Sequence, residues 1–338
     1  MYPNVEVELI QTPFVDYQTS LRLALDSDDS PDIVQYSPGP MRSIVPAGLV
    51  RPLDDYAELY GWKDRVPETI LGMLHSNEEA TQYGTGNLYA IPGAIQVVGV
   101  FYNRELTEAA GITDTPATLE EFEEHMDAVQ DSGVIPLSLP ALEVGGFQMW
   151  GALANVHADV DLFNSWVYGE PGSDLTEDPG FAEAAATLQE WGEAGYFADG
   201  VAAVADNDGV AEFSAGERAY FVTGNWNTDA FVEALGDDVG FFLMPGTEAD
   251  QPDVTMGSGY PYSISSKTEH PDVAAALLDY MVSPEAAEGI YNSGFVPVTS
   301  DDSLATSGVR GDILEGYEQA AGGNGVAPFP NWASTSML

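Results

Sequence analysis

The feature that most constrains the folding of this chain is its excess of acidic residues. Among 338 residues, 55 are Asp or Glu and only 9 are Lys or Arg, which gives a formal net charge of −46. Hydrophobic residues still make up 44% of the sequence, so the chain can bury a core and is too apolar for a disordered acidic tail. The length is compatible with two domains. Because the surface repels phosphates and anionic lipids, we expect neither a nucleic-acid partner nor docking to a membrane surface.

The acidic residues are scattered in pairs, such as Asp54-Asp55 and Asp301-Asp302, rather than gathered into long runs. A calcium-storage protein or an acidic interaction protein would be expected to cluster them. In dilute buffer the self-repulsion of such a surface opposes the compact state, whereas at ~1 M salt the screening length falls to roughly 3 Å. An ordinary core under a dispersed acidic surface therefore indicates adaptation to high salt.

Several kinds of chemistry lack the residues that they need. The chain has no cysteine, which excludes disulfides and thiolate chemistry, and its four histidines are tens of residues apart, so we expect no metal and no cofactor. The sequence contains no phosphate-binding glycine loop, dinucleotide fingerprint or nucleophile elbow, and we interpret Asp206-Asn207-Asp208-Gly209 as a turn. No apolar stretch approaches the ~18 residues of a membrane span. With 55 acids, proximity in sequence neither nominates nor excludes a catalytic carboxylate pair.

Short strand patterns alternate with helical patterns along the chain, which indicates an α/β fold. Residues 5–10 alternate apolar and polar side chains and predict a strand with one buried face, and residues 97–102 predict a strand buried on both faces. Thr118 and Glu121 form a capping-box pattern ahead of an amphipathic helix. Further helices are predicted at Asp16, Pro179, Pro271 and Pro284, and further strands at residues 31–36 and 219–223.

The most distinctive local feature is an aromatic residue where a strand ends. The predicted strand 219–223 breaks at Gly224-Asn225-Trp226, a position typical of the carboxyl edge of a sheet, where α/β folds bind ligands. The indole face suits the C–H face of a pyranose ring, and neighbouring amides can bond its hydroxyl groups. The alternative, that this Trp only plugs the edge of a domain, stays open on spacing alone.

Short motifs in a fixed order make the chain similar to a known family. They are Tyr2-Pro3-Asn4-Val5-Glu6-Val7, Ser30-Pro31-Asp32-Ile33-Val34-Gln35, Asn87-Leu88-Tyr89-Ala90-Ile91-Pro92, Phe101-Tyr102-Asn103-Arg104, Phe213-Ser214-Ala215-Gly216-Glu217-Arg218, Gly224-Asn225-Trp226 and Gly294-Phe295-Val296-Pro297-Val298. From Tyr2 to about Trp332 the sequence resembles the extracellular solute-binding proteins that feed ABC importers, in the sugar-binding branch related to maltodextrin-binding protein. It departs from the family pattern at Leu119, where a Trp is usual.

The resemblance implies an α/β, two-lobed periplasmic-binding-protein-like fold with a hinge and a ligand cleft between the lobes. Lobe one would comprise residues 1–96 plus 262–300, and lobe two residues 97–261 plus 301–338. Relatives carry a signal peptide, then another strand and helix, before the segment at which this chain starts, and they continue past its end. The resemblance therefore implies a chain truncated at both ends, whose full-length form is exported and lipid-anchored at the cell surface.

The resemblance also implies which residues contact the ligand. These are Tyr36, Ser37, Gln96, Trp150, Trp226, Gly257, Tyr260 and Trp332. Trp226 matches the stacking Trp of the family, and Gln96 lies at the first crossing between the lobes. The alternative that Tyr36 and Trp150 belong to the core stays open. The remaining Trp62, Trp166 and Trp191 are expected to pack helices.

The implied function is that of a monomeric receptor with no catalytic residue. It would capture a sugar or oligosaccharide by lobe closure and deliver it to the transmembrane subunits of an ABC permease. One alternative is a receptor for another solute, such as a polyamine or a quaternary amine that a Trp face could hold. A second alternative is a secreted halophilic glycosidase.

The charge leads to a prediction about stability. Between 0.1 and 2 M KCl we expect the midpoint of thermal unfolding to rise by roughly 5–10 °C, because salt screens the repulsion among the carboxylates. The midpoint is measured by calorimetry. A sucrose series, which leaves charge unscreened, serves as the control, and an unchanged midpoint in KCl would show that self-repulsion is unimportant.

Overall fold

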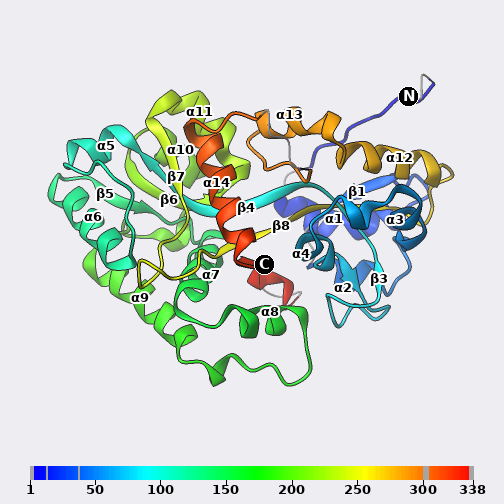
Figure 1. Ribbon diagram of the computed structural model, residues 1–338, viewed down its shortest axis with the longest axis horizontal. Coiled ribbons are helices and arrows are strands. Elements are labelled where there is room, and N and C mark those ends of the chain that lie inside the picture. Colours follow the sequence, from blue (N-terminus) through cyan, green and yellow to red (C-terminus); the bar gives the residue numbers. More distant parts are fainter. Residues whose placement is uncertain (1–3, 13, 37–38, 300–303, 335–338) are drawn as a thin grey trace.

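The computed structural model describes residues 4–12, 14–36, 39–299 and 304–334, which form a mixed α/β structure in two halves (Figure 1). The strands are β1 (Ile33–Gln35), β2 (His75–Ser76), β3 (Asn87–Leu88), β4 (Ile91–Asn103), β5 (Ile135–Ser138), β6 (Arg218–Gly224), β7 (Val239–Phe242), β8 (Thr255–Ile264) and β9 (Val326–Ala327). The helices are α1 (Phe14–Asp26), α2 (Met41–Ile44), α3 (Asp54–Tyr60), α4 (Glu68–Gly72), α5 (Arg104–Ala109), α6 (Leu119–Asp131), α7 (Gly145–His157), α8 (Val160–Tyr168), α9 (Gly180–Ala194), α10 (Asp206–Ser214), α11 (Thr228–Leu235), α12 (Pro271–Met281), α13 (Pro284–Asn292) and α14 (Gly308–Gly322).

We use "first half" for α1–α4, β1–β3 and α12, and "second half" for α5–α11 and β5–β7. Figure 1 shows these two groups side by side, with β4 and β8 running from one to the other. The lobe boundaries expected from the sequence stay a prediction.

Strand β4 is the element that both halves share. Its first part pairs antiparallel with β8, with Gln96 opposite Ser258, and its second part pairs with β6 and β7. The strand order in this sheet is β1-β8-β4-β6-β5, and β5 pairs parallel with β6. The backbone of β4 carries both sets of hydrogen bonds. Rotation of one half relative to the other would therefore bend or twist β4 and β8.

Aromatic side chains fill the core of the second half. Phe122 of α6 meets the rings of Trp191, Tyr220 and Phe242 edge-on, with centroids 5.9, 5.1 and 5.6 Å away. The predicted apolar face of α6 is confirmed, since Leu119, Phe122, Met126 and Val129 are buried. The predicted packing of Trp62 and Trp191 is also confirmed, because both side chains are fully buried.

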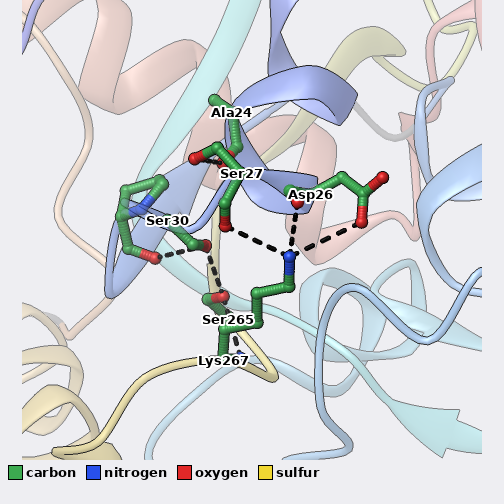
Figure 2. A network of polar contacts seen from close by, with 7 residues as sticks. Ala24, Asp26, Ser27, Ser30, Ser265 and Lys267 are labelled. Carbon is green, nitrogen blue, oxygen red and sulfur yellow. Dashed lines mark hydrogen bonds and ion pairs between the residues drawn. The ribbon is translucent and has the colours of Figure 1, made fainter.

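The few cations tie together segments that are distant in the sequence. Lys267, beyond β8, donates to the main-chain oxygens of Asp26 and Ser27 at the C-terminal end of α1, while Ser265 bonds Ser30 over 2.9 Å (Figure 2). A cation at this end of a helix also meets the negative end of its dipole. Other long-range ion pairs are Arg65–Asp279, Arg104–Asp312 and Arg310–Asp229.

Some predictions of local structure are wrong. Residues 5–10 are not a strand: the segment has no strand partner within the described residues, and Val7, Leu9 and Ile10 are 60%, 88% and 76% exposed. Alternation alone cannot make a strand, because the backbone donors and acceptors need a neighbour. The first helix begins at Phe14, so Asp16 lies in its first turn instead of preceding it.

Two other predictions need correction or refinement. Residues 206–209 were expected to be a turn, but they form the first turn of α10. In the capping box, the main-chain N–H of Glu121 donates to Thr118 Oγ1 as predicted, over 3.2 Å. The carboxylate of Glu121, however, accepts from the N–H of Ala117, one residue before the cap. No helix in the described part of the chain is long and apolar enough to cross a membrane.

The packing around Phe122 leads to a stability prediction. We expect Phe122→Ala to destabilise the protein by about 3–5 kcal/mol, because it empties a site enclosed by three rings. Leu59→Ala on α3 is the control, since Leu59 is 70% exposed and its loss should change little. Denaturant unfolding in high salt measures both, and similar losses for both variants would contradict this account of the core.

Candidate functional site

The turn after β6 is fastened to the crossing strand by a single side chain. Asn225 is fully buried, its Oδ1 accepts from the main-chain N–H of Val97, and its Nδ2 donates to the carbonyl of Ile95, both over 3.1 Å. A side-chain amide bonded on both edges to one strand holds the turn at a fixed position. The residue between these two contacts is Gln96, so the turn and the predicted Gln96 are neighbours.

Trp226 is positioned by the glycine that ends β6. A Cβ built on Gly224 would lie 1.9 Å from a ring carbon of Trp226, so the indole lies directly over this glycine. The Trp226 side chain is only partly buried, which leaves part of its surface accessible. Each residue of the Gly-Asn-Trp sequence therefore has a structural role. Gly224 leaves room for the indole ring, Asn225 holds the turn against β4, and Trp226 keeps part of its side chain accessible.

Gln96 and Gly257 meet where β4 and β8 pair. Gln96 Oε1 accepts from the hydroxyl of Ser258 over 2.7 Å, and the Ser258 side chain is fully buried. A Cβ on Gly257 would lie 2.5 Å from the carbonyl oxygen of Gln96, so only glycine allows this approach. The structure thus brings together three of the predicted residues: Trp226, Gln96 and Gly257.

The segment after α14 extends this cluster. Phe329 lies between Trp226 and Trp332, with ring centroids 6.2 Å from each. Trp332 in turn lies 6.2 Å from the ring of Tyr83, which belongs to the first half. A row of rings therefore runs from the Gly224-Asn225-Trp226 turn to the first half, although Trp332 itself is only 1% exposed.

Tyr36 and Trp150 have other neighbours than this cluster. Tyr36 is fully buried, its hydroxyl accepts from Ser263 over 3.0 Å, and burial raises the pKa of its phenol. Trp150, which is half-buried on α7, has the rings of Phe163 and Phe181 as neighbours, at 6.4 and 6.5 Å.

Tyr260 on β8 is also half-buried, and its ring lies 5.5 Å from that of Phe295 and 6.2 Å from that of Tyr262. Ser37 lies outside the described residues. Within the described part of the chain, no ring–ring pair joins Trp150 or Tyr260 to Trp226. Their role, like that of the other predicted contacts, stays a prediction.

Sequence reasoning missed two features of the structure. The first is the contact of Asn225 with the backbone of β4, which its position between Gly and Trp at a strand end could have indicated, because a side-chain amide can both accept from and donate to main-chain groups. Asp206, at the start of α10, has a buried Oδ1 without a partner, while its main-chain N–H donates to Glu143 over 2.9 Å. Burial, with the charge of Glu143 beside it, raises the pKa of Asp206 to about 6. No sequence pattern predicted that Asp206 and Glu143 would lie close together.

The site chemistry available here is neutral. The cluster offers indole and phenyl rings and the side-chain amide of Gln96, which suit apolar contact and hydrogen bonding rather than ionic attraction. Among the described residues no group of three or more His, Asp or Glu side chains is arranged to hold a metal ion. A hollow of about 610 Å³ lies on the first half, lined by residues such as Pro52, Glu79 and Asn87, and none of the seven predicted residues that the structure describes borders it.

Comparison with protein families shows to which family the chain belongs. The model of the bacterial extracellular solute-binding proteins matches residues 1–307. The chain belongs to this family. The maltotriose-binding protein of Pyrococcus abyssi is 25% identical over 95% of the chain, and the galactooligosaccharide-binding protein of Bacillus subtilis is 19% identical over 85%. The chain spans 66% and 65% of the length of these two relatives, just under two thirds.

Solved structures confirm the expected fold of this solute-binding protein. A protein studied for xylan utilization by Caldanaerobius polysaccharolyticus gives a TM-score of 0.81 at 23% identity, covering 98% of this chain and 84% of that one. A cyclo/maltodextrin-binding protein complexed with maltotetraose gives 0.69 at 19% identity, covering 97% and 80%. The α/β periplasmic-binding-protein fold predicted from the motifs is therefore confirmed.

The Gly224 contact leads to a prediction. In Gly224→Ala the new methyl group would meet the Trp226 ring, so we expect a shifted tryptophan emission spectrum and a loss of about 1–3 kcal/mol in unfolding free energy. Gly192→Ala is the control, because that position on α9 has open space and alanine favours a helix by about 1 kcal/mol. If Gly224→Ala left both emission and stability unchanged, the ring would not lie where we describe it.

Proposed function

We propose that this protein is the extracytoplasmic substrate-binding component of an ABC importer, which captures a sugar or oligosaccharide and delivers it unaltered to the permease. The observation that carries the proposal is the partly exposed Trp226, fixed by Gly224 and Asn225 against the strand that crosses between the halves. A ring held at that point can contact a ligand lying between the halves. Membership of the solute-binding family supports the receptor role.

The chemistry of the cluster supports a sugar. A pyranose has an apolar C–H face and a rim of hydroxyl groups, which match an indole surface and the side-chain amide of Gln96. Relatives named for binding maltotriose, galactooligosaccharide and diacetylchitobiose point the same way. We extend that class of ligand to this chain.

Closure would follow from how the halves are joined. A ligand that touches both halves stabilises the closed arrangement only through contacts that it lacks in the open one. Strands β4 and β8 are the joints around which such a hinge motion would turn. The family is extracellular, and we propose further that the full-length protein is a monomer, lipid-anchored at the surface of a cell that lives at high salt.

The test is a binding screen in ~2–3 M KCl, which screens the surface charge. Mono- and oligosaccharides are ranked by the rise that they cause in the unfolding midpoint, and the best is titrated by calorimetry. We expect Trp226→Ala to weaken its binding by roughly tenfold or more, through the loss of the stacking face. Tyr280→Ala, which removes a ring that is 54% exposed on α12, is the control. Unchanged affinity in Trp226→Ala would remove Trp226 from the site.

The same screen separates the alternatives. A receptor returns the sugar intact after incubation, whereas a glycosidase yields shorter products that chromatography detects. If a polyamine or quaternary amine raises the unfolding midpoint and sugars do not, the ligand that contacts the Trp226 ring is a cation. Either result would overturn the sugar-receptor proposal.

A further inference from the structure

Arg42, on the short helix α2 of the first half, gathers main-chain carbonyls from three separate segments. Its Nε donates to the carbonyl of Trp332 over 2.9 Å, and its Nη1 donates to the carbonyls of Ala80 and Thr81 over 3.2 Å each. Its Nη2 reaches the carbonyl of Val167, on α8 of the second half, over 3.5 Å. The guanidinium carbon also lies 4.7 Å from the centre of the Tyr83 ring.

The backbone beside Arg42 joins the same segments. The N–H of Tyr83, in the first half, donates to the carbonyl of Tyr168, the last residue of α8, over 2.9 Å. The next residue, Gly169, approaches so closely that a Cβ there would lie 2.4 Å from the carbonyl oxygen of Thr81. Residues 80–83 of the first half and residues 167–169 of the second half therefore touch directly, with Arg42 bonded to both.

We propose that Arg42 is a positioning residue for closure: its guanidinium holds the two halves together in the absence of ligand and so sets the affinity for whatever binds between them. The contact to Val167 and the pair Tyr83–Tyr168 join the halves away from β4 and β8, so rotation about those strands would break them. Interactions made only in the closed state raise its population. A ligand that needs the closed state then binds more tightly, in proportion to that population.

The chemistry of the contact fits a chain of this charge. Within the described residues, the hydrogen-bond partners of Arg42 are all carbonyl oxygens, and an arginine fork can serve several of them at once. Two of these carbonyls, at Val167 and Trp332, lie at the ends of helical segments, where oxygens lack partners within the helix. A carbonyl is no formal charge for salt to screen, so this contact can persist at the salt concentrations that suppress repulsion between the halves.

Closure can be measured without ligand, because the chain has no cysteine of its own. Spin labels on Leu59→Cys of α3 and Glu190→Cys of α9, both exposed, report the distance between the halves. In ~2 M KCl we expect Arg42→Ala to shift the distance distribution to longer values. Arg51→Ala is the matched control and should leave it unchanged, because Arg51 donates to the carbonyls of Ser265 and Ser266, beside β1 of the same half.

A second variant disrupts the contact between residues 80–83 and 167–169 by a change in the second half. Gly169→Ala places a methyl group against Thr81 and should also lengthen the distance, even if Arg42→Ala proves too unstable to label. Arg42→Ala should weaken binding of the best ligand from the screen by about tenfold, and Arg42→Lys, which keeps the charge but not the fork, by less. Wild-type distances in both Arg42→Ala and Gly169→Ala, or equal opening in Arg51→Ala, would overturn the proposal. Because the distances are measured without ligand, they do not depend on whether the ligand is a sugar.

Discussion

The hydrogen bonds of Asn225 to the backbone of β4 are the interaction on which the rest of this site depends. They fix the turn after β6 against the strand that both halves share, and this places Trp226 beside Gln96 and the β4–β8 pairing. A buried amide that satisfies both of its hydrogen-bonding edges on main-chain groups leaves no unpaired polar atom behind. The aromatic surface is therefore presented at the joint between the halves, where a ligand and a change of angle can influence one another.

The extreme acidity shapes how this structure is held together. With 9 cations against 55 acids, most carboxylates can have no cationic partner, and several of the cations join segments that are far apart in the sequence. Lys267 closes the end of α1, and Arg42 joins α2 to α8, both chiefly through carbonyl oxygens. Trp226, Gln96 and Gly257 themselves carry no charge.

Local patterns predicted several of the helices, because an amphipathic helix carries its own hydrogen bonds and shows its buried face in the sequence. The face of α6 and the starts of α12 and α13 at Pro271 and Pro284 follow from spacing and capping alone. Residues 5–10 show the limit of this reasoning, since a strand needs a neighbour that its own sequence does not specify. The turn expected at Asp206 failed for a related reason: residues typical of turns are also typical of a first helical turn.

The sequence by itself determined the net charge of −46, the α/β class and the family whose motifs run along the chain. Its nomination of Trp226, Gln96 and Gly257 found residues that lie together, because Asn225 ties the turn of Trp226 to β4, which carries Gln96, and β4 pairs with β8, which carries Gly257. Only the tertiary structure placed Tyr36 deep in the first half, set Trp150 against Phe163 and Phe181, and brought Arg42 to α8. Burial and long-range contacts depend on which surfaces of the folded chain meet. The residues next to a position in the sequence do not specify this.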